Sequence, residues 1–507
     1  MLNNSSYDVA VIGAGVSGLS CALILARHGK KVVVLEQHPR LAPVLRGFKR
    51  NGMFFDSGFH YVGGLGDDGP LWPLLRYLGL DIGLELTPFN PDGFDCLHNC
   101  TTGQRLCLPV GFENIRMQLS ARFPGAAKDI KEYLDDIERC WRSVPYLDLD
   151  LDLNEVVNAS VHGLTVAQAL ARFAPWPELQ GLLSMHGLLY GIEPSQALAS
   201  LNAQVAGSYY HSAHGIRGGG GAVVQTYVER LAAAGVEVRC GAEVTQILSE
   251  AGTVSGVCLS DGAEIQASEV IASMNPALLP EMLPAGAVRP AYLKRLQGLR
   301  QTASAYVLFA ACTNPVEVLQ GCNLFSQQGT GVFDSCLDQN VEERPLFLAA
   351  ATPQHLHAGV GDSEDGESKI RHGVIGIVPA AHSEVAPFWS GPHQRKHGYE
   401  SKKKEIGAAI CNRIRTCCPE LESLEQVDLS TPLTLQDYSM APAGAIYGVG
   451  RFAGQYNPQA VTRLPGLYLS GQAIAAPGLL GALVGAYMTC GSMLGHDLLR
   501  GELRKWR

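Results

Sequence analysis

Residues 6–36 read SYDVAVIGAGVSGLSCALILARHGKKVVVLE and predict a strand, a glycine turn, a helix and a second strand. Tyr7–Ile12 is rich in β-branched residues, as expected for a strand buried on both faces of a parallel sheet. Apolar residues recur at helical spacing from Leu19 to Ala26, Gly29 ends the helix, and residues 31–35 supply the second strand. This order is typical of a β-α-β unit.

The turn carries a G-x-G-x-x-G pattern at Gly13, Gly15 and Gly18. Gly13 permits the tight turn, Gly15 lets the backbone approach a pyrophosphate, and Gly18 lets the helix pack closely on the sheet. The free N–H groups of the first helical turn, which includes Val16 and Ser17, would point at the phosphates. The pattern therefore predicts a dinucleotide site.

Glu36 ends the second strand. A carboxylate there accepts hydrogen bonds from ribose hydroxyls and repels a 2′-phosphate, so it favours an unphosphorylated adenine nucleotide. An isolated glycine pattern could be an ordinary glycine-rich turn, but here strand, glycines, helix and acid occur together. The unit alone does not distinguish FAD from NAD.

Length and composition describe a globular α/β enzyme of two or three domains. The chain has 507 residues, 46% of them hydrophobic, 17% charged and 57 of them glycine. A net charge of −9 argues against nucleic acid as a partner. Because the N-terminus carries no secretion signal, we expect a cytoplasmic protein. In that compartment the fourteen cysteines would be reduced.

Two stretches have alternative interpretations. Cys96, His98, Cys100 and Cys107 approach the spacing of metal ligands, but they lie in a predicted strand–turn–strand and no second ligand pair follows, so we expect no metal site. Residues 466–495 contain no charge, but Pro477 and several glycines divide them into a strand, a turn and a helix rather than a membrane span.

Two groups of motifs resemble the flavin-containing phytoene desaturase, carotenoid isomerase and retinol saturase family, and most of all its retinol saturase branch. The first group is Glu36-Gln37-His38, Asn51-Gly52, Phe55-Asp56-Ser57-Gly58 and His60-Tyr61. The second is Gly466-Leu467-Tyr468-Leu469-Ser470-Gly471-Gln472-Ala473 followed by Pro477-Gly478-Leu479-Leu480-Gly481.

The resemblance implies FAD as the cofactor, with the turn after Asp56 beside the flavin and a C-terminal helix that points its positive end at the reduced ring. It also implies that the backbone at Val244 contacts adenine. The predicted FAD-binding residues are Gly13, Gly15, Val16, Ser17, Gly18, Glu36, Gln37, Ser57, Gly58, Val244, Gly471, Gln472, Gly478, Leu480 and Gly481.

The resemblance further implies an α/β architecture, in which a Rossmann-like FAD-binding domain carries an inserted α+β substrate domain. Residues 1–80, 206–284 and 436–507 would form the discontinuous FAD-binding domain, and residues 81–205 and 285–435 the substrate-binding domain. This is the architecture of flavoproteins with two dinucleotide-binding motifs.

Two positions depart from the family pattern. The family has a Gly-Gly pair where this chain has Ala42-Pro43, and an aspartate where it has Ala473. Proline removes a backbone donor and fixes φ, so the loop cannot approach a dinucleotide as glycines would. These losses allow weaker FAD binding, a different flavin pose or the loss of redox chemistry.

The sequence therefore predicts an FAD-dependent oxidoreductase that desaturates or saturates carbon–carbon bonds of a small apolar polyene or isoprenoid-like substrate, by hydride transfer with flavin N5. His60 and Tyr61 are the predicted proton-handling or substrate-orienting residues. The alternatives are a redox-neutral polyene isomerase and a lipid- or partner-binding scaffold that has lost FAD; amine oxidation ranks below them. The resemblance also implies peripheral contact with the inner face of a membrane, and the oligomeric state stays open.

Overall fold

A computed structural model describes residues 6–152, 163–333, 336–351, 359–360 and 370–507. The predicted β-α-β unit forms as β1 (Tyr7–Ile12), α1 (Val16–Arg27) and β2 (Val32–Glu36). Strand β1 is buried on both faces, because Val9 and Val11 belong to one apolar core and Ala10 and Ile12 to another. The prediction of a doubly covered strand is confirmed.

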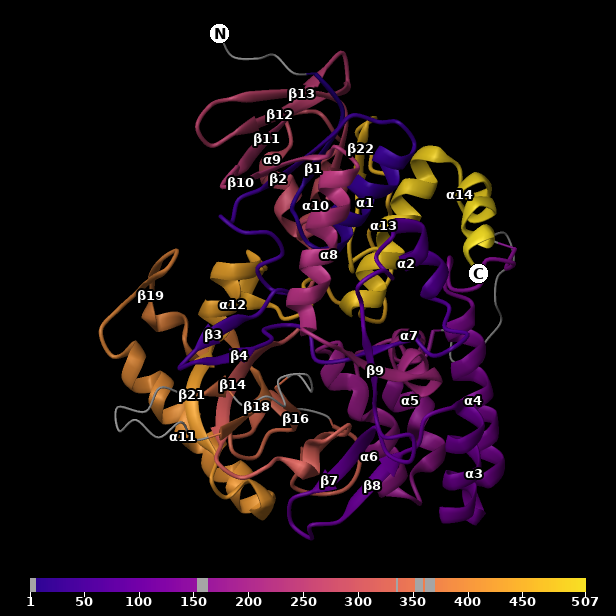
Figure 1. The fold of residues 1–507 in the computed structure, drawn as a ribbon, viewed down its shortest axis with the longest axis vertical. Helices are drawn as coiled ribbons and strands as arrows, with labels where there is room; N and C mark the ends of the chain where they lie inside the picture. Colours follow the sequence, from indigo (N-terminus) through magenta and orange to yellow (C-terminus); the bar gives the residue numbers. More distant parts are fainter. Residues whose placement is uncertain (1–5, 153–162, 334–335, 352–358, 361–369) are drawn as a thin grey trace.

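Seven strands form the first sheet, at the top of Figure 1. Strands β10, β2, β1, β13 and β22 lie side by side in parallel, and β12 and β11 extend the sheet from β13 with antiparallel pairing. The strands not yet given are β10 (Glu237–Cys240), β11 (Val244–Glu250), β12 (Thr253–Leu259), β13 (Glu264–Ala272) and β22 (Leu467–Leu469). Helices α1 and α13 (Gly478–Leu494) pack together against this sheet.

Eight strands form the second sheet, in the lower half of Figure 1, in the order β21-β14-β18-β16-β15-β7-β8 with β17 beside β18. Only β15 and β7 pair in parallel among these described strands. The strands are β7 (Asp95–Asn99), β8 (Arg105–Leu108), β14 (Ser304–Cys312), β15 (Asn323–Gln327), β16 (Leu346–Ala350), β17 (Gly359–Val360), β18 (Ile370–Ala380) and β21 (Glu425–Ser430).

Smaller sheets and further helices complete the fold. The short strands are β3 (Phe48–Arg50), β4 (Met53–Phe55), β5 (Val62–Gly63), β6 (Leu86–Pro88), β9 (Ala213–Ile216), β19 (Trp389–Gly391) and β20 (Gln394–Arg395). The helices are α2 (Trp72–Leu78), α3 (Phe112–Arg122), α4 (Ala127–Arg142), α5 (Val166–Leu170), α6 (Pro177–Ser184), α7 (Ala199–His211), α8 (Gly219–Ala233), α9 (Leu279–Met282), α10 (Pro290–Gln297), α11 (Tyr399–Cys417), α12 (Pro432–Ser439) and α14 (His496–Leu503).

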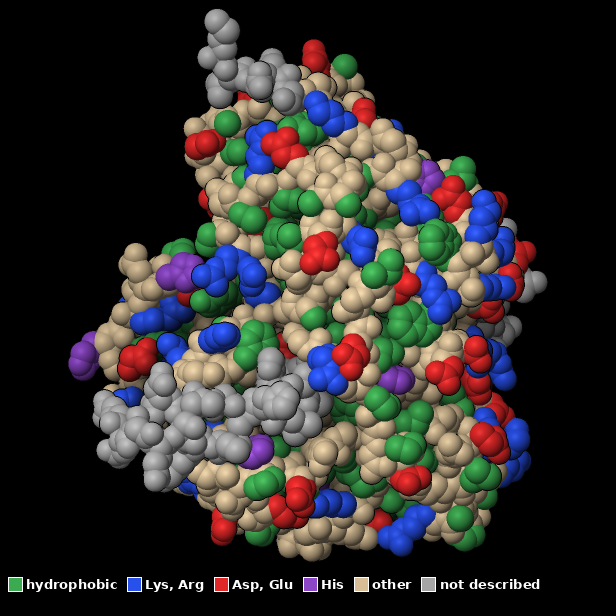
Figure 2. Space-filling model, viewed as in Figure 1, with side chains coloured by type: hydrophobic (Ala, Val, Ile, Leu, Met, Phe, Trp, Pro, Cys, Tyr) green, Lys and Arg blue, Asp and Glu red, His purple; other side chains and the backbone are tan. Residues whose placement is uncertain are grey.

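The uncharged run at residues 466–495 forms β22 and α13, as predicted. Among the described residues, no helix is both long and apolar enough to cross a bilayer. The mixed α/β architecture agrees with the sequence prediction, whereas the exact domain boundaries stay a prediction. Figure 2 shows Lys and Arg interspersed with Asp and Glu, so neither sign of charge covers the viewed face.

The expectation of reduced thiols throughout is wrong for one pair. Cys96 and Cys107 form a disulfide, and their Cα atoms are 3.9 Å apart. The two residues lie directly opposite each other in the antiparallel pairing of β7 and β8, a register that the sequence did not reveal. Within the described residues, no cluster of three or more His, Cys, Asp or Glu side chains is arranged to hold a metal.

Candidate active site

A cavity of about 1270 Å³ lies between the two sheets. Its walls come from the turn after β1, the end of β2 and the start of α13 on one side, and from α7, β14, β18, β21 and α12 on the other. Pockets for one small molecule usually measure about 300–1,000 Å³. The cavity therefore has room for an extended ligand and a second molecule beside it.

The fold brings most predicted site residues together in this cavity. His60 and Tyr61 line it. So do thirteen of the predicted cofactor residues, namely Gly13, Gly15, Val16, Ser17, Glu36, Gln37, Ser57, Gly58, Val244, Gly471, Gln472, Gly478 and Leu480. Gly18 and Gly481 are not among the lining residues.

The glycines of the first turn differ in what surrounds them. Gly13 has a φ of +98°, which suits the tight turn after β1. A Cβ added to Gly15 would meet nothing within 4 Å, because this backbone faces the open cavity. A Cβ on Gly18 would collide with the carbonyl oxygen of Gly13, and one on Gly481 with that of Ala476. Gly18 and Gly481 are thus packed closely against the backbone, and a contact of either residue with the cofactor stays a prediction.

Two helices begin at the cavity wall. Val16 and Ser17 open α1, and Gly478 and Leu480 lie in the first turn of α13. In the described structure, neither helix has a side-chain cap or an acidic residue in its first turn. Their N–H groups and positive dipole ends can therefore receive an anionic ligand.

Glu36 is fixed at the end of β2 and is only 8% exposed. Its Oε2 accepts a hydrogen bond from the backbone N–H of Ala14, and its Oε1 accepts one from that of His38, each at 2.8 Å. These bonds hold the carboxylate rigidly at the cavity wall. Each oxygen keeps a second lone pair, so the carboxylate can still accept ribose hydroxyls.

The two departures from the family pattern lie in different surroundings. Ala42 forms part of the cavity wall and keeps a φ of +44°, a left-handed conformation that glycine adopts without strain. Its N–H donates to the carbonyl oxygen of Ala14 at 3.1 Å, which holds the loop against the glycine turn. Ala473 instead is buried in the apolar core that contains Ala10 and Val33 and is not among the cavity-lining residues.

The long four-glycine segment, Gly218–Gly221, serves the protein itself. Gly218 and Gly219 have positive φ values, and the N–H of Gly220 donates to Asp56 Oδ1 at 2.9 Å. Asp56 thus lies buried at the N-terminus of α8, and burial raises its pKa to about 7. The segment is not among the cavity-lining residues. Its glycines instead let the backbone lie close to Asp56 and to the backbone of Leu45.

Aromatic side chains cover the part of the cavity near the second sheet. Tyr61 stacks on Tyr209 with ring centroids 4.3 Å apart, and both line the cavity together with Tyr447. Burial raises the pKa of all three tyrosines, so they stay neutral at physiological pH. Sequence analysis missed Tyr209 and Tyr447, because they come from distant segments and no local motif marks them.

The hydroxyl of Tyr61 is bound behind the cavity wall. It donates to Asp95 Oδ2 at 2.8 Å, and Nε2 of His186 lies 2.8 Å from the same oxygen. The side-chain amide of Asn323 donates to Asp95 Oδ1 at 2.8 Å. Asp95 and His186 are fully buried, so this network fixes the plane of the Tyr61 ring.

His60 differs from Tyr61, because its ring nitrogen Nδ1 is buried without a hydrogen-bond partner among the described residues. Burial lowers the pKa of His60 to about 4. The imidazole is therefore neutral at physiological pH, with one nitrogen that can accept a proton and one that can donate.

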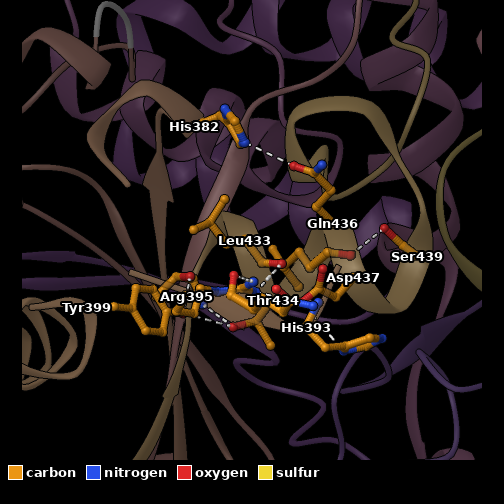
Figure 3. Close-up of polar contacts among 12 residues, drawn as sticks. His382, His393, Arg395, Tyr399, Leu433, Thr434, Gln436, Asp437 and Ser439 are labelled. Atoms are coloured by element: carbon orange, nitrogen blue, oxygen red, sulfur yellow. Dashed lines mark hydrogen bonds and ion pairs between the residues drawn. The ribbon is translucent and has the colours of Figure 1, made fainter. Parts of the chain in front are cut away.

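Helix α12 contributes Thr434, Leu435 and Tyr438 to the cavity wall and is anchored from its other side. Figure 3 shows this anchor: Arg395 Nη2 lies 2.5 Å from Asp437 Oδ2, and His382 Nε2 lies 2.9 Å from Gln436 Oε1. The Tyr399 hydroxyl also contacts Thr431 at 2.8 Å. His382 is thus a structural partner of Gln436.

A glycine turn at a parallel sheet, a carboxylate at the end of the second strand and a cavity shared with a second sheet are the features of a dinucleotide-binding protein. Residues 16–369 match the sequence pattern of the flavin containing amine oxidoreductases, and the chain belongs to this family. The expected choice of FAD over NAD is thereby confirmed.

Named relatives agree with the resemblance seen in the motifs. The chain is 28% identical to all-trans-retinol 13,14-reductase of Rattus norvegicus, over 97% of this chain and 86% of that protein. It is 23% identical to hydroxyneurosporene desaturase of Rubrivivax gelatinosus, over 97% and 94%. An oxidoreductase structure from Methanosarcina mazei shares the fold with a TM-score of 0.66, at 15% identity over 94% of this chain and 98% of that one.

Proposed function

We propose that this protein is an FAD-dependent oxidoreductase that saturates or desaturates carbon–carbon bonds of an apolar conjugated substrate. The observation that carries the proposal is the wall of neutral aromatic rings formed by Tyr61, Tyr209 and Tyr447 in the same cavity as the dinucleotide turn. Flat apolar rings offer a conjugated chain stacking contacts and no competing charge.

The residues present fit FAD. The open backbone at Gly15 and the N-terminus of α1 suit a pyrophosphate, Glu36 suits the adenosine ribose, and Val244 lies on the same wall. The second helix N-terminus, at Gly478, would stabilise negative charge on the flavin ring. Gly64, which directly follows β5, packs against the first turn of α13, since a Cβ added to it would lie 3.6 Å from Leu480 Cδ1.

When bound, FAD supplies hydride transfer at N5. The chain's own residues would orient the substrate and exclude water. The Tyr61 hydroxyl is held by Asp95, so its ring would serve as an orienting surface. His60, neutral and with a free nitrogen, would handle the proton that accompanies the hydride.

Amine oxidation is less well supported by the site. An ammonium substrate is held by a carboxylate or between aromatic faces near the reacting end, and the Tyr61 and Tyr209 rings stack on each other at 4.3 Å, which leaves no gap between them for a cation. The carboxylates among the described lining residues are Glu36, Glu243, Glu281 and Asp428. Glu243 adjoins Val244 at the nucleotide end, and Asp428 is paired with Arg50 and Lys403.

The first experiment is the absorbance spectrum of the purified protein with and without added FAD. We expect flavin bands that remain after removal of free FAD, and their absence would support the scaffold alternative. The FAD-loaded protein is then incubated without oxygen with all-trans-retinol, once with the flavin reduced and once with it oxidised. A gain or loss of two hydrogens by mass spectrometry supports the proposal. A new isomer of unchanged mass would support the isomerase, and an unchanged substrate together with turnover of putrescine would support amine oxidation.

The membrane contact and the cytoplasmic location belong to this proposal as well. An apolar polyene dissolves in a bilayer, so we expect the protein to bind peripherally to the inner face of a membrane when it loads substrate. Flotation with lipid vesicles tests the contact. Counting free thiols in protein alkylated inside intact cells tests the location: a reducing cytoplasm would leave Cys96 and Cys107 as free thiols, whereas an oxidising compartment would keep them as the disulfide and count against the proposed location.

A further inference from the structure

Cysteines gather where β7 ends against the last turn of α11, outside the cavity. Cys100 directly follows β7, Cys417 is the last residue of α11, and Cys418 comes next. Arg413 precedes Cys417 by one turn on α11 and its Nη2 lies 4.0 Å from Cys100 Sγ, so this face of the helix presents Cys417 toward Cys100. Both side chains are partly exposed, so a small solute can reach them.

The groups around Cys100 favour its thiolate. The Cys417 thiol faces it, the Cys100 Sγ lies 2.9 Å from Ser326 Oγ, and Ser326 Oγ lies 3.0 Å from His98 Nδ1. The buried guanidinium of Arg413 adds positive charge, with Nη2 4.0 Å from the sulfur. Together these contacts, the bond from Cys417 foremost, lower the pKa of Cys100.

Cys417 has the opposite environment. It lies at the C-terminal end of α11, where the helix dipole disfavours a negative charge. The contact with Cys100 and burial both raise its pKa, so it keeps its proton. The two cysteines are thus divided into an ionised sulfur and a neighbouring thiol in contact with it. This is the arrangement of an attacking and a resolving cysteine.

We propose that Cys100 and Cys417 form a peroxide-reactive pair that closes into an intramolecular disulfide. The Cys100 thiolate attacks hydrogen peroxide; an S–O bond forms, the O–O bond breaks, and hydroxide leaves and takes up a proton to become water. The Cys417 sulfur then forms the S–S bond as the S–O bond breaks, and a second water carries away its proton. Two thiols are oxidised by two electrons and one peroxide is reduced to two waters.

Peptide mapping of the full-length protein tests this proposal without flavin or substrate. The protein is reduced, desalted, treated with hydrogen peroxide and alkylated before digestion. We expect a peptide linked through Cys100 and Cys417, lighter by two hydrogens and absent before treatment. In Cys417→Ser, dimedone should label Cys100 as a sulfenic acid. The matched control Cys258→Ser removes another partly exposed cysteine and should leave the linked peptide unchanged.

A second readout uses the untreated native protein and needs no variant. At pH 6, iodoacetamide should label Cys100 at least tenfold faster than Cys258, because only a thiolate reacts. Equal labelling rates, a bond from Cys100 to Cys418, or the absence of both the linked peptide and the dimedone product would overturn the proposal.

Discussion

Replacing Gly15 by alanine is expected to weaken FAD binding without destabilising the protein. Gly15 has φ −76° and ψ 175°, an extended conformation open to any residue, and an added Cβ meets nothing within 4 Å. Without flavin, the free energy of unfolding should stay unchanged or rise by up to about 1 kcal/mol, because alanine restricts the unfolded chain. The methyl group would nevertheless fill the space in front of the α1 N-terminus.

The loss of affinity follows from the hydrogen bonds that a displaced pyrophosphate gives up. A hydrogen bond to a charged group is worth about 1.5–3 kcal/mol, so losing one weakens binding about ten- to a hundredfold. Titration with FAD, followed by flavin fluorescence, measures the affinity, and urea unfolding of the flavin-free protein measures stability.

Two further glycines serve as controls for this experiment. Gly501 lies in α14 with open space around it, so Gly501→Ala should change neither FAD binding nor folding by more than the intrinsic glycine effect. Gly18→Ala should destabilise the flavin-free protein, because its Cβ meets the Gly13 carbonyl. Wild-type FAD affinity in a folded Gly15→Ala variant would refute the placement of the pyrophosphate, and a lowered stability would refute the open space.

Three other substitutions test the surroundings of the cavity. Because burial raises the pKa of Asp56 from 3.8 to about 7, the folded state holds this proton more tightly, and stability is lost as pH rises between those values, by at most about 4 kcal/mol. Asp56→Asn should remove that slope from urea unfolding curves measured at pH 4 to 8. Ala42→Gly should raise the free energy of unfolding by about 1 kcal/mol, because glycine relieves the φ of +44°; an unchanged melting temperature would count against strain there. Tyr61→Phe removes a donor to buried Asp95 and should cost about 1–3 kcal/mol in urea unfolding while polyene affinity, measured by fluorescence quenching, is retained.

The nucleotide half of the site was predictable because its signals are local. The run of β-branched residues, the three glycines and Glu36 all lie within residues 6–36, and each has a role set by its place in one β-α-β unit. The structure places Gly13 and Gly15 at the cavity as expected. At Gly481, only three-dimensional packing reveals that the missing side chain makes room for the Ala476 carbonyl.

The substrate half was not predictable, because its contacts join distant segments. Asp95 meets His186 across 91 positions and Asn323 across 228, and no motif spans such separations. Tyr61 belongs to a family motif, but only the structure shows that its hydroxyl is already bound and that it lines the cavity. The Cys96–Cys107 bond likewise depends on a strand register that spacing alone does not fix.

The two departures from the family pattern do not by themselves account for a loss of FAD. A dinucleotide is held in such a fold mainly by backbone N–H groups and helix dipoles, and substitutions of side chains leave these in place. A missing carboxylate acceptor at Ala473 removes about 1.5–3 kcal/mol, which is about ten- to a hundredfold in affinity. Ala42 retains the backbone conformation of a glycine, so Pro43 is the change that alters the cavity wall. A scaffold that has lost flavin would therefore require further substitutions at Gly15 or Glu36. Both residues are present and line the cavity.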